Sequence, residues 1–377
     1  MNSIIKAGLL LNTIKAPYEI FMTLCEKYEP EDLFRGEREK LWEQLEMSKN
    51  VQARLAAILA KDGWAEGELE RVEDLGARFI TAKDSDYPEK LRELAKPPVG
   101  IYIRGNPDIL SKPSVAIVGT RKSSTYGRDS AYELARALAQ ANIIVVSGGA
   151  RGIDASAHRG CLDSNGRTVA VFGTGIGRTY PAEHKELFAK ILERGALISE
   201  YPVNSGGEVW RFAERNRIIA ALSSHVIVAE STDGGGAMKT ARLALELGRV
   251  VKPIPGRIDE LSFKGSNELV NLNKGNGAVT SAAKFVQSII GEPQVDIKFD
   301  DNNNNVREEP DLNQSSQLSL NSDEEKIIYS LIQKFKRVTT DDLLLESGLE
   351  FASLQSTLVE LEAQGLIQTQ AGRYFIS

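Results

Sequence analysis

Short apolar runs alternate with stretches of helical apolar spacing through residues 113–256. Six short apolar runs in this region are typical of buried strands, and they span Val115–Val118, Ile143–Ser147, Val169–Phe172, Ala196–Ser199, Val226–Ala229 and Val250–Ile254. Between most of these runs the apolar positions follow helical spacing, which predicts helices at Arg128–Gln140, Glu183–Glu193 and Ala237–Leu247. Strands that alternate with helices predict an α/β fold with a Rossmann-like, doubly wound and mostly parallel sheet.

The segments that precede this region follow other patterns. Residues 1–75 have apolar positions at helical spacing and predict a small helical domain. Residues 76–112 contain turn and strand signals such as Asp86-Tyr87-Pro88 and Pro97-Pro98. We group them with the α/β region, which gives one predicted domain at residues 76–291.

The last part of the chain combines an acidic segment with a compact tail. Residues 292–321 are rich in Asp, Asn, Ser and Gln, and this composition predicts a disordered linker. Residues 322–377 predict three helices and then two strands, at Glu324–Gln333, Thr339–Glu346, Ala352–Gln364, Ile367–Thr369 and Tyr374–Ile376. This order is typical of a winged-helix domain.

The net charge of −6 is distributed unevenly along the chain. Residues 292–325 hold ten acidic and two basic residues, whereas residues 113–256 hold 18 basic and 13 acidic ones. The overall acidity therefore does not exclude a polyanionic ligand for the α/β region. Residues 326–377 hold five basic and six acidic residues. Because DNA-binding winged helices are usually basic, we expect this tail to bind protein or to be vestigial.

The cysteines and the N-terminus indicate the compartment. Cys25 and Cys161 are far apart and follow neither a disulfide nor a zinc-binding pattern. The N-terminus shows no signal-peptide pattern, and no stretch is apolar enough to span a bilayer. We therefore expect a soluble, cytoplasmic protein.

Glycine-rich turns follow the first two predicted strands. Gly119-Thr120-Arg121 closes the first strand, and Ser147-Gly148-Gly149-Ala150-Arg151-Gly152 follows the second. A strand that turns into a helix presents free main-chain N–H groups and the positive end of the helix dipole, which bind anions. An arginine in the turn matches the geometry of phosphate. Two such turns on one sheet edge predict a ligand with more than one phosphate.

Further basic residues lie near the predicted strand ends. Lys185 begins a helix, Arg215-Asn216-Arg217 precedes the fifth strand, and Lys239 follows Gly234-Gly235-Gly236. We call the following set the predicted cationic rim: Arg121, Arg151, Lys185, Arg215, Arg217 and Lys239. A row of spaced cations suits a nucleic-acid backbone better than one small phosphate. In the alternative interpretation the glycines only form tight turns, and the two arginines at 215 and 217 pair with Glu214 or Glu230.

Aromatic and histidine side chains add weaker signals. The candidates for stacking on bases are Tyr126, Phe172, Tyr180, Trp210 and Phe212. Trp210 is the preferred one because it follows a polar loop, whereas Phe172 lies within a strand and is expected in the core. His158 follows Asp154 by one helical turn, and we expect it to pack or cap a helix rather than bind a metal.

The usual cofactors of this fold are not indicated. The first turn lacks the G-x-G-x-x-G motif, and the second strand does not end in the acid that binds a ribose hydroxyl. The sequence also lacks a P-loop motif and a visible nucleophile–base–acid trio. We expect no metal, no cofactor, and a binding protein rather than an enzyme.

Several motifs together resemble the DprA family, also called Smf, of bacterial DNA-processing proteins. The most specific are Gly152-Ile153-Asp154-x-x-Ala157-His158 and Arg215-Asn216-Arg217-Ile218-Ile219. Further matches lie at Asp86-Tyr87-Pro88, Val115–Arg121, Tyr126-Gly127, Gly173–Pro181, Ser199–Pro202, Glu230, Thr240-Ala241 and Pro255-Gly256. The run Gly235–Lys239 departs from the Ser-Gly-Ser pattern that is usual in the family.

The resemblance implies an architecture and a function. It implies a SAM-like helical domain, a Rossmann-like domain that binds single-stranded DNA and dimerises, and a winged helix. It implies that the protein loads the RecA recombinase in place of single-strand-binding protein during natural transformation (competence), without catalysis. Combined with the cationic rim, the predicted DNA-binding residues are Gly119, Thr120, Arg121, Ser147, Gly148, Gly149, Arg151, Gly152, Lys185, Arg215, Asn216, Arg217 and Lys239.

Two other hypotheses stay open at this point. The glycine turn at 234–236, with Glu246 on the following helix, is similar to that of phosphoribohydrolases, which would make the protein a nucleotide-processing enzyme. Alternatively, the α/β domain no longer binds DNA, and the acidic linker and the tail recruit partners as an interaction scaffold.

Overall fold

The structure, a computed structural model, describes residues 2–272, 277–291, 322–335, 338–364, 366–370 and 373–376. The chain divides into two compact units, Met1–Asp296 and Ile297–Ser377, each of which is described by itself. The predicted linker at 292–321 lies outside the described residues, and the predicted domain boundaries stay predictions. Among the described helices, none has the length and apolar character that crossing a bilayer requires.

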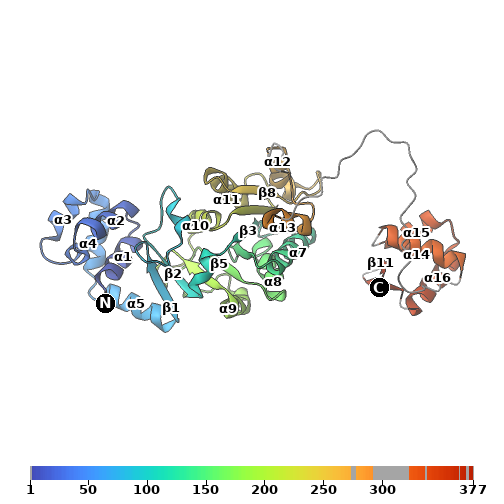
Figure 1. Cartoon of the computed structure of the whole chain (residues 1–377), viewed down its shortest axis with the longest axis horizontal. Helices are drawn as coiled ribbons and strands as arrows, with labels where there is room; N and C mark the ends of the chain where they lie inside the picture. The colour runs from blue at the N-terminus through green and yellow to red at the C-terminus, as the bar shows by residue number, and fades with distance from the viewer. Residues whose placement is uncertain are drawn as a thin grey trace. The chain divides into compact units, whose positions relative to one another are not determined.

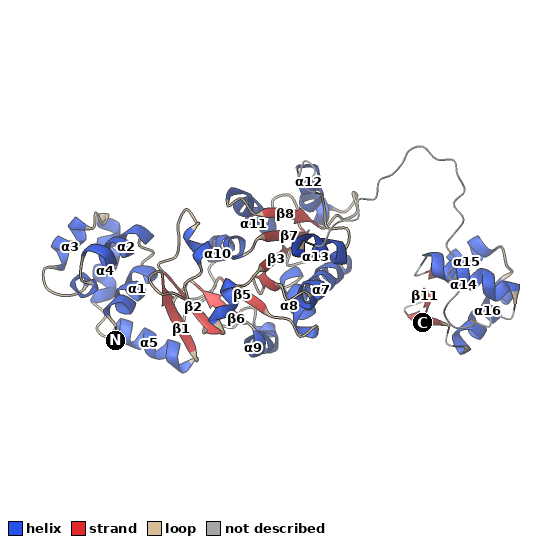
Figure 2. Ribbon diagram, in the orientation of Figure 1, coloured by secondary structure: helices blue, strands red, loops and turns tan. Residues whose placement is uncertain are grey.

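The first unit is built around an eight-stranded sheet with the order β1-β2-β6-β5-β4-β3-β7-β8 (Figure 2). Its strands are β1 (Ala77–Thr81), β2 (Gly100–Gly105), β3 (Ser114–Gly119), β4 (Ile144–Ser147), β5 (Thr168–Phe172), β6 (Ala196–Ser199), β7 (His225–Glu230) and β8 (Val250–Pro253). Strands β3 to β8 pair in parallel, and β1 and β2 extend the sheet antiparallel beyond β6. All six predicted strands are therefore confirmed, and the segment 76–112 adds two more.

Both faces of the sheet are covered because each strand buries alternate residues on opposite sides. Val115 and Ile117 of β3 pack in one cluster with helices on one face, namely α7 (Thr125–Gln140), α8 (Ile153–Asp163) and α13 (Ala282–Ile290). Ala116 and Val118 pack in another cluster with α10 (Val209–Leu222) and α11 (Gly236–Glu246). Helix α9 (Lys185–Arg194) lies on the same side as α8 (Figure 1). The predicted doubly wound, Rossmann-like fold is confirmed.

Five helices precede the sheet and form what we call the helical head. They are α1 (Ser3–Thr13), α2 (Tyr18–Lys27), α3 (Arg38–Gln44), α4 (Lys49–Leu59) and α5 (Trp64–Asp74), with a short 3-10 turn at Pro30–Leu33. Helix α1 contacts β1 and β2, and its Leu9 is buried with Phe79 and Tyr102 of these strands. The head therefore packs directly on the antiparallel edge of the sheet.

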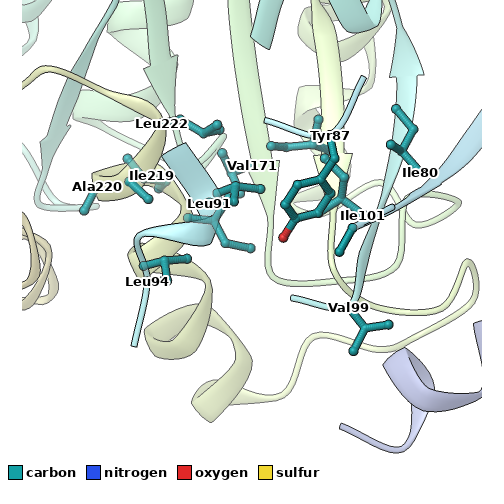
Figure 3. Close-up of a cluster of buried hydrophobic side chains, with 14 of the residues drawn as sticks. Ile80, Tyr87, Leu91, Leu94, Val99, Ile101, Val171, Ile219, Ala220 and Leu222 are labelled. Carbon is teal, nitrogen blue, oxygen red and sulfur yellow. The ribbon is translucent and has the colours of Figure 1, made fainter. Parts of the chain in front are cut away.

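The segment between β1 and β2 covers the outer side of α10. It contains the short helix α6 (Glu89–Arg92), whose Leu91 lies beside Val171 of β5 and Ile219 of α10 (Figure 3). Tyr87 is buried in the same cluster, and its hydroxyl donates a hydrogen bond of 2.7 Å to the carbonyl of Pro98. Helix α10 is thus packed between this segment and the sheet.

The second unit is the predicted winged helix. Its elements are α14 (Asp323–Phe335), β9 (Val338–Thr339), α15 (Thr340–Ser347), α16 (Phe351–Ala363), β10 (Ile367–Gln370) and β11 (Arg373–Ile376). Ile328, Leu343, Leu354 and Leu358 form its core, and the strands pair in the order β10-β11-β9. The three helices and two strands predicted from the sequence are confirmed, whereas the two-residue β9 was too short to show a pattern.

His158 of α8 is fully buried, as expected for a packing residue. Its Nδ1 lies 2.7 Å from the hydroxyl of Thr168, which itself donates to the carbonyl of Val145. Because the hydroxyl has one proton to give, Nδ1 of the ring carries the hydrogen and donates to it. Burial lowers the pKa of His158 to about 3. The imidazole is therefore neutral at neutral and mildly acidic pH.

We expect this histidine to make folding sensitive to mild acid. Below pH 6.5 the unfolded chain binds a proton that His158 in the folded chain does not, so stability falls as the pH falls. The loss is about 1.4 kcal/mol per pH unit between the two pKa values. Urea unfolding at pH 7 and pH 5.5 measures it, with His158→Asn as the control. An equal loss in both proteins would contradict a neutral, buried His158.

Candidate nucleic-acid interface

A cleft of about 380 Å³ opens at the carboxyl ends of β3 and β7. Strands β4, β5 and β6 follow β3 to one side, whereas β7 and β8 lie on its other side, so the strand order reverses here. Ligands of doubly wound sheets bind at this reversal point. The cleft is lined by residues 118–122 at the end of β3, by residues of α10, and by residues around the start of α11, namely Ser231, Thr232, Gly235, Gly236, Ala237, Lys239 and Thr240. Ala150 and Asp154 complete the lining.

The first predicted turn is held rigidly at one wall of the cleft. The N–H of Thr120 donates to the carbonyl of Glu230 at 2.8 Å, and the N–H of Ile153 donates to the carbonyl of Thr120 at 3.3 Å. A Cβ atom on Gly119 would lie 2.4 Å from the side chain of Ile153, so only glycine fits at this position. Arg121 is exposed, and its guanidinium carbon lies 5.1 Å from the centre of the Phe212 ring.

Glu230 positions this turn rather than facing the ligand. Its side chain is fully buried at the end of β7. The N–H and the hydroxyl of Ser124 donate to its carboxylate at 2.9 and 2.8 Å. The carboxylate therefore fixes the segment between β3 and α7, which carries Arg121 and Lys122.

The second predicted turn, at 147–152, does not offer its N–H groups as expected. The N–H groups of Gly148 and Ala150 donate to the Asp154 carboxylate at 3.1 and 3.3 Å. The Ser147 hydroxyl donates to the carbonyl of Ile117 at 2.6 Å. The Asp154 carboxylate thus occupies the position predicted for a phosphate. The N–H groups of Gly148 and Ala150 are therefore not free to bind an anion, which corrects the expectation for this turn.

The two other glycines of this turn allow close approach of the main chain. Gly149 has a φ of +67°, and its carbonyl accepts a hydrogen bond of 3.0 Å from Nδ1 of His184. Gly152 has a φ of +76°, and a Cβ atom there would lie 2.4 Å from the carbonyl oxygen of Thr120. The turn at 147–152 therefore packs closely against the turn at Gly119–Arg121 and helps to fix its position.

Arg215 lies beneath the cleft rather than on an exposed rim. Its side chain is 4% exposed and donates to the carbonyls of Gly148, at 2.7 Å, and Val171. Burial lowers its pKa to about 10, although the nearby Asp154 carboxylate opposes this shift. Burial also raises the pKa of Asp154, opposed chiefly by Arg215. Arg215 therefore borders the cleft from its floor. Because main-chain carbonyls take up its Nη1 donors, it does not present an exposed cation there.

Arg217, unlike Arg215, does not line the cleft. Its Nη2 lies 2.7 Å from both carboxylate oxygens of Glu200, and the two side chains are 14% and 4% exposed. The ion pair that was considered as an alternative therefore exists, but with Glu200 in place of Glu214 or Glu230. The rim position predicted for Arg217 was wrong because this side chain points to the other face of α10.

Lys185 and Arg151 lie outside the main cleft. Lys185 is exposed at the start of α9. Arg151 is exposed and pairs with Glu183, and it borders a small groove that continues from the cleft past Tyr180 and Phe212. Of the six residues of the predicted cationic rim, the structure therefore brings Arg121 and Lys239 together as exposed cations in the cleft and leaves Arg151 beside it.

The cleft also contains groups that the sequence argument did not select. Lys122 is exposed beside Arg121, and Thr232 and Gly235 lie at the turn that begins α11. Asn216 was predicted and is present, partly exposed, on α10. The second turn that borders the cleft is therefore the glycine turn before α11, and its signal, Gly234-Gly235-Gly236 followed by a helix, was visible in the sequence.

The aromatic side chain in the cleft is Phe212. It lies under Arg121, and its ring centre is 5.2 Å from that of Tyr180. Trp210, the preferred stacking candidate, is 51% exposed but packs edge-on against Tyr201 and beneath Arg211. Successive residues on α10 point about 100° apart, so Phe212 and Trp210 face different surfaces.

Two family models match the chain. The model for DNA recombination-mediator protein A matches residues 78–289, and the model for the DprA winged helix domain matches residues 310–373. A DprA-type DNA processing protein of Mycobacterium tuberculosis is 34% identical over 346 residues, which cover 88% of this chain and 84% of that protein. The chain belongs to the DprA family.

Solved DprA structures agree with this assignment. DprA from Streptococcus pneumoniae has 29% sequence identity and a TM-score of 0.63, over 76% of this chain and 97% of that one. DprA from Helicobacter pylori, whose structure was described for its single-stranded DNA binding mode, has 30% identity and a TM-score of 0.51. That match covers 56% of this chain and 96% of that one. The resemblance to the DprA family that the sequence indicated is therefore confirmed.

We expect Arg215→Met to destabilise the fold by about 3 kcal/mol. The substitution leaves Asp154 buried without its opposing charge, and breaking a buried charge pair from one side typically costs this much. Urea unfolding of the two proteins measures the difference. Arg121→Ala is the matched control, because an exposed arginine changes stability by only about 0.5 kcal/mol. Equal stability of the two variants would mean that Arg215 does not support the cleft.

Proposed function

We propose that this chain binds single-stranded DNA through its phosphate backbone and acts as a recombination mediator. The observation that carries the proposal is the grouping of exposed cations in one cleft. Arg121 and Lys122 lie on the turn after β3, and Lys239 lies across the cleft on α11. Cations that face one cleft from two sides suit successive phosphates of a strand.

The turn before α11 would add main-chain donors to these cations. Helix α11 begins at Gly236, after Gly235 and Thr232 at the edge of the cleft. The N-terminus of a helix carries free N–H groups and partial positive charge, which stabilise a bound phosphate. The ring of Phe212 would stack on a base of the strand. Arg121 would either move off the ring or stack on the same base.

We propose that the strand continues from the cleft along the small groove past Tyr180 to Arg151. Arg151 is exposed there, and Lys185 lies further along as a predicted contact. The following predicted residues would act by shaping the turns rather than by contacting DNA: Gly119, Ser147, Gly148, Gly149, Gly152 and Arg215. Arg217 would act in the same indirect way, because Glu200 occupies its guanidinium.

We expect Arg121→Ala to weaken the binding of a fluorescent oligo-dT and to flatten its salt dependence. Each phosphate contact that is lost lowers the log–log slope of affinity against salt by about 0.7 for single strands. Fluorescence anisotropy across a salt series measures both effects. Arg159→Ala, which removes an exposed arginine of α8, is the matched control and should change neither. Salt-insensitive binding in the unmodified protein would rule out a backbone-binding cleft.

The mediator function extends this proposal to protein partners. We propose that the bound chain loads RecA onto the strand and displaces single-strand-binding protein, in the cytoplasm and without a catalytic step. The support is the membership in a family of recombination mediators. RecA assembly on strands coated with single-strand-binding protein, with and without this protein, is the corresponding assay. If the Arg121→Ala variant supports RecA assembly as well as the unmodified protein does, RecA loading does not depend on DNA binding in the cleft.

The enzyme hypothesis has less support from the site. Glu246, which a phosphoribohydrolase-like reaction would need near Gly234–Gly236, is exposed at the opposite end of α11. A helix of this length places the two ends about 15 Å apart. Among the described residues, the cleft lining contains one carboxylate, Asp154, which the N–H groups of Gly148 and Ala150 and the nearby Arg215 already engage.

We also propose that two copies associate through the segment around helix α12 (Lys264–Leu272). Ile258 is 99% exposed, and Leu261 and Leu272 are 79% and 62% exposed. Large apolar side chains gathered on one exposed segment favour a protein interface. Sedimentation should give a dimer that Ile258→Asp converts to a monomer. Ile327→Asp, which alters an exposed isoleucine of the winged helix, should stay dimeric, and a monomeric unmodified protein would contradict the proposal.

A further inference from the structure

A partly buried group of charges holds α10 on the side that faces away from the cleft. We call it the charge cluster, and it consists of Lys15, Glu200, Glu214 and Arg217. Nη2 of Arg217 lies 2.7 Å from both carboxylate oxygens of Glu200. Nζ of Lys15 lies 2.9 Å from Oε1 of Glu200 and 3.5 Å from Oε2 of Glu214. The two cations therefore balance the two carboxylates.

One of these cations comes from the helical head. Lys15 follows α1 and has a φ of +53°, and its Nζ lies 4.3 Å from the centre of the Tyr201 ring. Asn12 of α1 is 2% exposed, and its side-chain amide donates to the carbonyl of Glu200 at 2.8 Å. Its side-chain oxygen accepts from the N–H of Gly100 at 3.2 Å. The head thus contacts Glu200 through both a main-chain and a side-chain group.

The charge cluster and the cleft are connected by a single helix. Phe212 and Asn216 of α10 lie four residues apart and line the cleft, whereas Glu214 and Arg217 lie three residues apart on the other face. Residues at these spacings share a helix face. A shift of α10 at the charge cluster therefore moves Phe212 relative to Arg121 and Lys239, which are attached to other elements.

We propose that Lys15 is a positioning residue that couples the helical head to DNA binding in the cleft, an inference that rests on the proposed function. Without its ammonium group, Glu200 keeps its ion pair with Arg217, whereas Glu214 loses its ion pair and keeps the hydrogen bond from the Tyr201 hydroxyl. Removing one partner from a partly buried set of charges leaves a charge uncompensated. The carboxylates then gain by moving toward water, and Glu214 takes α10 with it. Lys15 acts on the cleft from a different pocket and touches no DNA.

The test compares Lys15→Met with Lys6→Met in the full chain. Both lysines belong to the head and have side chains 26% exposed, but Lys6 pairs with Glu66 of α5 and not with α10. Lys15→Met should weaken oligo-dT binding at least about fivefold, the lower end of couplings between separate sites. Its salt slope should stay unchanged because no phosphate contact is lost. Lys6→Met should leave the affinity unchanged, and Lys15→Arg should restore it.

A spectroscopic signal separates positioning from a general loss of stability. The chain has three tryptophans, of which Trp42 and Trp64 belong to the head and Trp210 begins α10. In protein labelled with fluorotryptophan, Lys15→Met should shift the ¹⁹F signal of Trp210, assigned by Trp210→Phe. A merely destabilised head would instead shift Trp42 and Trp64. Should Lys15→Met fail to fold, Glu214→Gln removes the same contact from the α10 side.

The outcomes distinguish this inference from the proposed function. If the unmodified protein binds oligo-dT, and the Lys15→Met variant binds it with equal affinity and an unchanged Trp210 signal, the coupling is overturned. The proposal of DNA binding is then unaffected. A shifted Trp210 signal in protein that does not bind oligo-dT would mean that the charge cluster positions α10 but that the proposed function is wrong. Loss of affinity in Lys6→Met as well would overturn a specific role of Lys15.

Discussion

The buried guanidinium of Arg215 is the interaction on which the architecture of the cleft depends. It joins α10 to the carbonyls of Gly148, after β4, and Val171, in β5, and it lies opposite Asp154 of α8. A buried cation is tolerated only where its hydrogen bonds and its charge are both matched. Helix α10, strand β5, and the turn after β4 with the start of α8 are therefore fixed relative to one another beneath the cleft.

The same interaction determines which turn is left for a ligand. Asp154 is the carboxylate near Arg215, and it accepts the N–H groups of Gly148 and Ala150. The turn after β4 thus serves as support, although its glycines resemble those of a phosphate-binding loop. The free turns are those after β3 and β7, where the strand order reverses and where Arg121, Lys122 and Lys239 are exposed. A cationic side chain that faces solvent can bind a polyanion, whereas one that already pairs with groups of the protein cannot.

Helix α10 has a different task on each of its faces. One face carries Phe212 and Asn216 into the cleft, and the other carries Glu214 and Arg217 into contact with Glu200 and with Lys15 of the helical head. An apolar strip of the helix packs on β5 and α6 (Figure 3). A helix held on three sides has little freedom, so the head and the sheet both influence where its cleft residues lie.

The sequence by itself determined the elements whose burial follows a simple period. The six parallel strands and the winged helix were predicted because apolar residues repeat there without interruption. The bounds of helices α8 and α10 were not predicted. Small and polar residues such as Asp154 and His158 are buried in α8, and Arg215 is buried in α10, so neither helix shows a regular apolar stripe.

Some of the predicted site residues line one cleft at the carboxyl ends of the strands, whereas Arg151, Lys185 and Arg217 lie outside it. Which of them face a ligand was decided by the tertiary structure, because it depends on partners that come from distant segments. Arg217 forms an ion pair with Glu200, and the N–H of Gly148 donates to Asp154. Arg121 lies over the ring of Phe212 and stays exposed. The sequence shows that a residue is charged, but whether a partner of opposite charge lies beside it depends on how distant segments pack in the folded protein.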